Sequence, residues 1–159
     1  MSKLLPLCKH PFHLLSLGLG SGLAPKAPGT FGTLMAVPIY LLLLEPLSDA
    51  VYLAALIALT GLGVFLCGQT AKALGVHDHP AIVWDEFAGF WLTAYLLPEG
   101  WWWLVAAFVL FRVFDIVKPW PISWLDKRMK GGFGIMIDDI VAGLFAWGVI
   151  QLAARFINA

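Results

Sequence analysis

The residues in this sequence best suited to chemistry are five acids in its second half. Carboxylates close to hydrocarbon are costly, about 2.5 kcal/mol or more on membrane-insertion scales, and several together repel one another. A hard divalent cation with oxygen ligands offsets both effects, and Mg²⁺ typically takes one or two carboxylates together with phosphate and water. The pattern predicts a magnesium site whose candidate metal ligands and catalytic residues are Asp85, Glu86, Asp115, Asp138 and Asp139.

A purely structural role is the alternative for each of these acids taken alone. Four of them fall in the first turns of predicted helices, where an acid interacts favourably with the helix dipole. That account fails for Asp115, which lies near a predicted helix C-terminus. Arg112, three residues earlier, or Lys118, three residues later, could pair with it. The five acids considered together favour a functional site.

The elements that must position these acids are five apolar stretches. With 60% hydrophobic residues, 13% charged residues and a mean hydropathy of +0.85, the chain is too apolar for a soluble core of its size. A membrane span needs about 20 apolar residues, so the third stretch begins at headgroup level or only partly crosses. The stretches cover residues 30–47, 50–74, 83–97, 101–118 and 135–157.

These stretches predict an all-α fold, a small polytopic membrane protein with four to five membrane helices. We expect a single domain over residues 1–159, with an interfacial N-terminal segment, 1–28, and a helical bundle, 30–158. Small residues that follow the acids along the chain should let the helices approach closely behind the site. They are Ala88, Gly89, Thr93, Ala142 and Gly143.

The distribution of basic residues predicts the orientation of the bundle. If the spans alternate, most Lys and Arg residues fall on one side, with Arg155 alone on the other. The positive-inside rule makes the first side cytoplasmic, so the five acids lie at the cytoplasmic ends of their helices. The residues on that side are Lys3, Lys9, Lys26, Lys72, Lys118, Lys127, Arg128 and Lys130.

Several groups near the acids are candidates to bind an anionic substrate. Arg112 and Lys118 could bind phosphate oxygens, although Arg112 could instead hold Asp115 and Lys118 could complement a helix end. Glycine-containing segments open the first and last spans, where free amides near Thr30 and Gly134 could bind an anion. The remaining candidates are Thr33, Lys26, which is equally a positive-inside residue, and His79, which could instead order its loop.

The sequence argues against several other functions. Neither cysteine is followed by the arginine of a cysteine-phosphatase loop, and the zero net charge offers no nucleic-acid-binding surface. An ion or proton transporter would need acids spread through the membrane depth, whereas the far halves of these spans are apolar. A lipid headgroup transferase would need a spaced Asp-Gly and Ala-Arg signature, which the sequence lacks.

At these residues the sequence closely resembles the phosphatidylglycerophosphatase A family. The matching segments are 20–30, 75–79, 83–87, 111–121 and 131–143, in order along the chain. The resemblance implies a magnesium-dependent lipid phosphatase of the bacterial inner membrane, multi-pass, with its active site facing the cytoplasm. Its implied substrate is the lipid phosphatidylglycerophosphate, and the five acids carry over as metal and catalytic positions.

A direct attack by water is our working hypothesis for the reaction. Glu86 would act as general base, while Mg²⁺ held by the four aspartates and the cations Lys118 and Arg112 would stabilise the phosphate. An aspartyl-phosphate intermediate is the alternative. The pattern distinguishes neither one metal ion from two nor a monomer from an oligomer.

Overall fold

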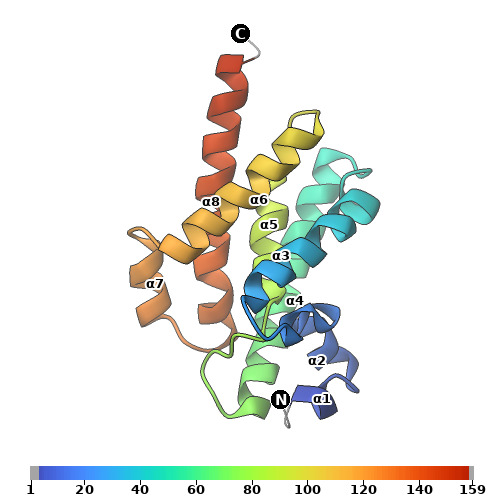
Figure 1. Ribbon diagram of the computed structural model, residues 1–159, viewed down its shortest axis with the longest axis vertical. Helices are drawn as coiled ribbons and strands as arrows, with labels where there is room; N and C mark the ends of the chain where they lie inside the picture. The colour runs from blue at the N-terminus through green and yellow to red at the C-terminus, as the bar shows by residue number, and fades with distance from the viewer. Residues whose placement is uncertain (1–3, 158–159) are drawn as a thin grey trace.

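The computed structural model describes residues 4–157, and the regular secondary structure of this part of the chain is all helical, with no strand. Lys3 and the ends of the predicted segments 1–28 and 30–158 lie outside the described residues. The elements in order are α1 (Leu4–Leu7), α2 (Pro11–Ser16), the 3₁₀ segment η1 (Gly18–Leu23), α3 (Pro28–Ile39), the π-helical turn η2 (Tyr40–Leu44), α4 (Asp49–Leu74), α5 (Trp84–Thr93), α6 (Trp101–Val117), α7 (Ile122–Arg128) and α8 (Gly131–Ile157) (Figure 1).

Each predicted span contains a helix, but the helices differ in length. Within residues 4–157, only α4 and α8, with 26 and 27 residues, are long and apolar enough to cross a membrane. Helix α6 has 17 residues and α5 has 10, whereas a full crossing takes about 20. The predicted number of four to five membrane helices is therefore not confirmed. The third stretch, predicted to be short, is shorter still.

Helix α5 lies inside the bundle and packs against α8, α4 and α3 (Figure 1). Close packing with α8 depends on glycine: a Cβ on Gly89 would lie 2.7 Å from the Asp139 carbonyl oxygen, and one on Gly143 would overlap the Gly89 carbonyl. The Thr93 hydroxyl also reaches the Gly143 carbonyl, at 3.3 Å. The predicted close approach of these helices is confirmed, and it brings the first turn of α5 beside Asp139.

The N-terminal segment is docked on the bundle. Helix α2 packs against α4, where His13 Nδ1 lies 2.9 Å from the Thr70 hydroxyl. The Ser16 carbonyl accepts a hydrogen bond from the Val83 amide at 3.0 Å. Because Val83 directly precedes α5, this contact anchors the helix that carries Asp85 and Glu86.

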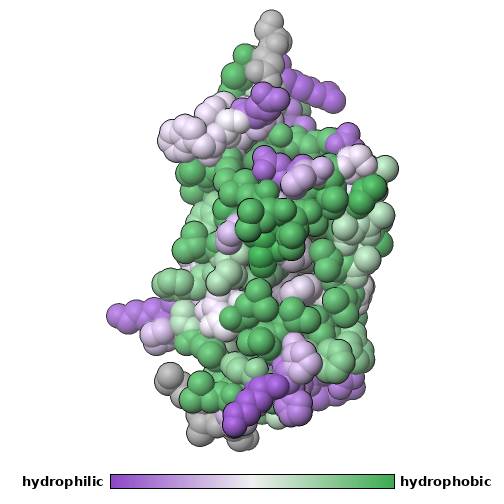
Figure 2. Space-filling view, turned by 90° about the vertical axis from the view of Figure 1, so that its right-hand side faces the viewer, coloured by the Kyte–Doolittle hydropathy of each residue, from purple (hydrophilic) through white to green (hydrophobic). Residues whose placement is uncertain are grey.

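The outer surface of the bundle is strongly apolar. On the face shown in Figure 2, hydrophobic residues form a broad band across the middle, and most hydrophilic residues lie towards the two ends. Only 28% of the most apolar window of α4 and 22% of that of α8 is buried. A core helix of a soluble protein would be mostly buried, whereas the bundle leaves most of the apolar surface of these two helices uncovered.

Candidate functional site

A cavity of about 350 Å³ is lined by five segments, four of which contribute charged residues. The first turn of α5, the last turns of α6, the third turn of α8, the start of α3 and the loop before α5 all contribute to its lining. Two cationic side chains, Arg112 and Lys118, face six carboxylates, an excess of four negative charges. The acids are Asp78, Asp85, Glu86, Asp115, Asp138 and Asp139.

Three of the carboxylates are crowded together. Asp85, Glu86 and Asp139 each offer an oxygen, and these oxygens all lie within 4.8 Å of one another. The three acids share a second feature: each has one buried carboxylate oxygen without a hydrogen-bond partner among the described residues. Buried acceptors are rarely left unpaired, and like charges this close need a cation or protons. The cluster therefore has the charge, the oxygen donors and the free lone pairs that a hard divalent cation requires.

Arg112 holds Asp115, which the sequence analysis gave as the alternative to binding phosphate. Its Nη1 lies 2.6 Å from Asp115 Oδ2, 3.9 Å from Glu86 Oε1, and donates to the Thr33 hydroxyl at 3.3 Å. Arg112 thus compensates Asp115 at the unfavourable end of α6. Its buried Nε has no hydrogen-bond partner within residues 4–157.

Lys118 connects three helices around the cavity. It ends α6 in a left-handed conformation, and its Nζ donates to Asp138 Oδ2 at 2.6 Å and to Asp126 Oδ1 at 2.7 Å. Because Asp138 is on α8 and Asp126 on α7, Lys118 is held at the cavity by both.

The other candidate substrate-binding residues do not line the cavity. Thr33 is buried, donates to the Gly29 carbonyl at 2.9 Å and accepts from Arg112, so it supports the site from behind. Lys26 is exposed and Thr30 is half-buried. His79 Nδ1 accepts from the Ala81 amide at 3.1 Å, which is the loop-ordering role left open as its alternative.

The structure corrects the prediction that the amides of Thr30 and Gly134 are free to bind an anion. The Thr30 amide donates to the Ala27 carbonyl at 3.0 Å, and the Gly134 amide donates to the Lys130 carbonyl at 3.4 Å. The Thr30 amide makes a 3₁₀-type bond to the residue just before α3, and the Gly134 amide makes the first i→i−4 bond of α8. Neither amide is available to an anion.

Two residues of the site were missed from sequence. Asp78 lines the cavity, and burial raises the pKa of its carboxyl group; its position between two histidines was the one available signal. Gly29 lies where a Cβ would overlap Glu86 Oε1 and would come within 3.1 and 3.2 Å of the two terminal nitrogens of Arg112. A glycine before a helix looks like an ordinary turn residue, so nothing local indicated this contact.

Comparisons with known proteins agree on one family. Residues 14–154 match the family model described as Phosphatidylglycerophosphatase A. The chain is 52% identical to Phosphatidylglycerophosphatase A of Escherichia coli K12 over 145 residues, which is 89% of this chain and 82% of the relative. The namesake from Haemophilus influenzae is 46% identical, with 86% and 85% covered. A Bacteroides thetaiotaomicron protein named as a candidate phosphatidylinositol-3-phosphatase is 37% identical, with 88% and 91% covered. No significant match to a solved structure was found.

Proposed function

The chain belongs to the phosphatidylglycerophosphatase A family, and on this premise we propose that it hydrolyses the terminal phosphomonoester of phosphatidylglycerophosphate. The products are phosphatidylglycerol and inorganic phosphate, a step of phospholipid biosynthesis. The observation that carries the proposal beyond the family name is the cavity in which the oxygens of Asp85, Glu86 and Asp139 lie within 4.8 Å of one another.

Magnesium is part of the proposal because the charge in the cavity demands a cation. An excess of four negative charges would repel a phosphomonoester, which is itself an anion. The donor set fits Mg²⁺, since all ligands are oxygens and the three clustered acids have unpartnered buried oxygens. Asp85, Asp139 and Glu86 would hold the ion, with Asp138 and Asp115 beside them. Bound there, Mg²⁺ supplies Lewis-acid stabilisation of charge on phosphate oxygens.

The chain's own residues would bind the phosphate and move the proton. Arg112 lines the cavity, and Lys118 presents its ammonium group between two carboxylates. These cations would hold the phosphate and stabilise charge in the transition state. Glu86 is our candidate for the general base that takes a proton from the attacking water. Its Oε2 is buried and has no partner in the described part of the chain.

We further propose that the protein is embedded in the bacterial inner membrane, with this cavity at the cytoplasmic surface. The apolar outward faces of α4 and α8 support embedding, and the clustering of Lys and Arg residues on one side supports the orientation. The acyl chains could then stay in the bilayer while only the headgroup enters the cavity.

The direct test is phosphate release from purified protein in mixed detergent micelles with defined lipids. We expect release from phosphatidylglycerophosphate with Mg²⁺ present, and phosphatidylglycerol as the lipid product by mass spectrometry. Phosphatidylinositol 3-phosphate should be included because one relative carries that name. Absence of release from phosphatidylglycerophosphate with every divalent cation tried would reject the proposed activity.

Gly29→Ala tests whether the cavity needs the close approach of α3. The added methyl group must displace Glu86 or Arg112, so we expect kcat to fall by roughly tenfold to a hundredfold. The thermal midpoint should change little, because alanine is a good helix former. The matched control is Gly148→Ala on α8, where a Cβ meets nothing within 4 Å. Equal kinetics for both variants would contradict the role of Gly29.

A further inference from the structure

A second cavity, of about 600 Å³, lies at the other end of the same helices. Helix α3 begins at the candidate active site, with Gly29 in its first turn, and leads into η2, whose Tyr40 lines this cavity. Helix α5 likewise has Asp85 in its first turn and is followed by Ala94 in the second cavity. Helix α6 runs the opposite way, from Trp101 at the second cavity to Asp115. The two cavities are therefore separate, and neither the family match nor the proposed reaction gives the second one a role.

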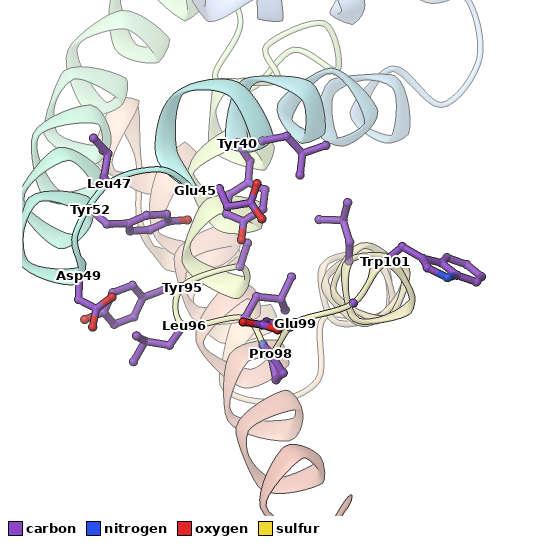
Figure 3. Close-up of a pocket in the computed structure, with 15 residues that line it drawn as sticks. Tyr40, Glu45, Leu47, Asp49, Tyr52, Tyr95, Leu96, Pro98, Glu99 and Trp101 are labelled. Atoms are coloured by element: carbon purple, nitrogen blue, oxygen red, sulfur yellow. The ribbon is translucent and has the colours of Figure 1, made fainter. Parts of the chain in front are cut away.

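The side chains that line this second cavity carry negative charges but no positive charge. Glu45, Asp49 and Glu99 line it and are exposed at its rim, while no Lys, Arg or His residue is among its lining side chains. Figure 3 shows the three acids coming from different segments around the same hollow. A cavity lined in this way attracts cations and repels anions.

The acids are too far apart to share a small metal ion. Among the described residues, the one group of acidic, His or Cys side chains with ligand atoms close enough for a metal is the cluster at the other cavity. A cation bound by Glu45, Asp49 and Glu99 must therefore be larger than a bare metal ion, or reach only one or two of them.

Aromatic rings supply the inner wall. The rings of Tyr40 and Tyr52 lie 6.3 Å apart, and those of Tyr52 and Tyr95 lie 5.4 Å apart. Figure 3 shows these tyrosines around the same hollow as Glu45, Asp49 and Glu99, with Trp101 at one side. Aromatic faces attract organic cations such as ammonium groups, which are large and only partly hydrated.

One polar group in this wall lacks a partner. The Tyr52 hydroxyl donates to the Trp91 carbonyl at 2.6 Å. Tyr40 is only 5% exposed and lines the cavity. No hydrogen bond joins its hydroxyl to a described residue, and this oxygen is not among the fully enclosed atoms that lack a partner, so it opens onto the cavity. Buried tyrosine hydroxyls usually find a partner. The hydroxyl of Tyr40 is thus available, as donor or acceptor, to a molecule in the cavity.

The wall opposite Tyr40 is held in a fixed shape. Leu96 has a left-handed backbone, with φ of 54°. Its carbonyl accepts from Gln151 at 2.9 Å, and the neighbouring Tyr95 carbonyl accepts from Trp147 at 2.9 Å, both from α8. Strained backbone held by specific contacts is typical of preformed binding sites.

From these observations we propose that the second cavity binds an organic ammonium ion. The rim acids provide the counter-charge, the tyrosine rings pack against the cation, and the Tyr40 hydroxyl completes its hydrogen bonds. The same chemistry is offered by two sources: the aminoethyl headgroup of a membrane lipid, or a soluble amine. This proposal does not depend on the proposed phosphatase activity.

The test measures binding to the full chain in detergent without any activity assay. Spermidine, titrated calorimetrically, represents the soluble source, and phosphatidylethanolamine, followed by native mass spectrometry against phosphatidylcholine, represents the lipid source. The variants are Glu45→Gln with Glu99→Gln, and Tyr40→Phe. Asp126→Asn is the matched control, because it removes a carboxylate near the other cavity.

We expect the double acid variant to weaken binding by about tenfold and Tyr40→Phe by about threefold, because each loses one class of contact with the cation. Binding of spermidine alone assigns a soluble amine, and selective binding of phosphatidylethanolamine alone assigns a lipid headgroup. The proposal is overturned if neither probe binds. It is also overturned if Asp126→Asn weakens binding as much as the cavity variants do.

Discussion

Asp139→Asn is expected to lower the rate of phosphate release by at least about a thousandfold, the scale of losing a main electrostatic contribution in an active site. Asp139 is buried on α8 with one oxygen unpartnered among the described residues, and its other neighbours in the cluster are Asp85 and Glu86. The amide keeps the shape of the side chain but removes the charge. The measurement is phosphate release from phosphatidylglycerophosphate micelles at saturating Mg²⁺.

A measurement of thermal stability shows whether Asp139→Asn loses activity because the charge is gone or because the protein is unfolded. In the presence of a chelator, Asp139→Asn should be at least as stable as the wild type, because the substitution relieves repulsion among crowded carboxylates. The control is Arg155→Gln, which changes a charged residue to an amide on the same helix but at its exposed far end. A thermal midpoint lowered in Asp139→Asn, or near-normal activity in that variant, would contradict the role given to Asp139.

Removal of divalent cations is expected to abolish phosphate release, and Mg²⁺ should raise the thermal midpoint of the wild type. A ligand that binds only the folded state stabilises it by about 2.7 kcal/mol when present at a hundred times its Kd. The stabilisation should grow with Mg²⁺ concentration, and it should be strongly reduced in Asp139→Asn, which loses a ligand. Thermal unfolding with increasing Mg²⁺ measures this without any substrate.

The Glu86→Gln variant tests whether Glu86 acts as the general base or as a metal ligand. The two measurements are again phosphate release and thermal unfolding with increasing Mg²⁺. If Glu86 mainly takes the proton, the variant should lose activity yet keep most of its Mg²⁺-dependent stabilisation. If Glu86 mainly holds the ion, both should be lost together, as in Asp139→Asn. A wild-type midpoint that does not respond to Mg²⁺, together with activity that survives chelation, would reject the magnesium part of the proposal.

Much of the arrangement was predictable from sequence because its signals are local. Apolar composition and breaks at proline and glycine located the helices that carry the acids, and the five predicted acids do line one cavity. Spacing along the chain was enough for this, since acids near the same end of neighbouring helices must lie at similar depth. The glycines of α5 and α8 were also identifiable, because small residues at helical spacing mark close packing.

The partners of each side chain were decided only by the tertiary structure. The pairing of Lys118 with Asp126 and Asp138 depends on where α7 docks on α8, which no short-range pattern encodes. Helix α5 has only 10 residues and lies buried inside the bundle, which the apolar pattern of residues 83–97 did not indicate. The second cavity likewise joins residues about 50 positions apart, such as Glu45 and Glu99. Helix periodicity and charge act over a few residues, whereas the distances that select these partners are set by packing between distant segments.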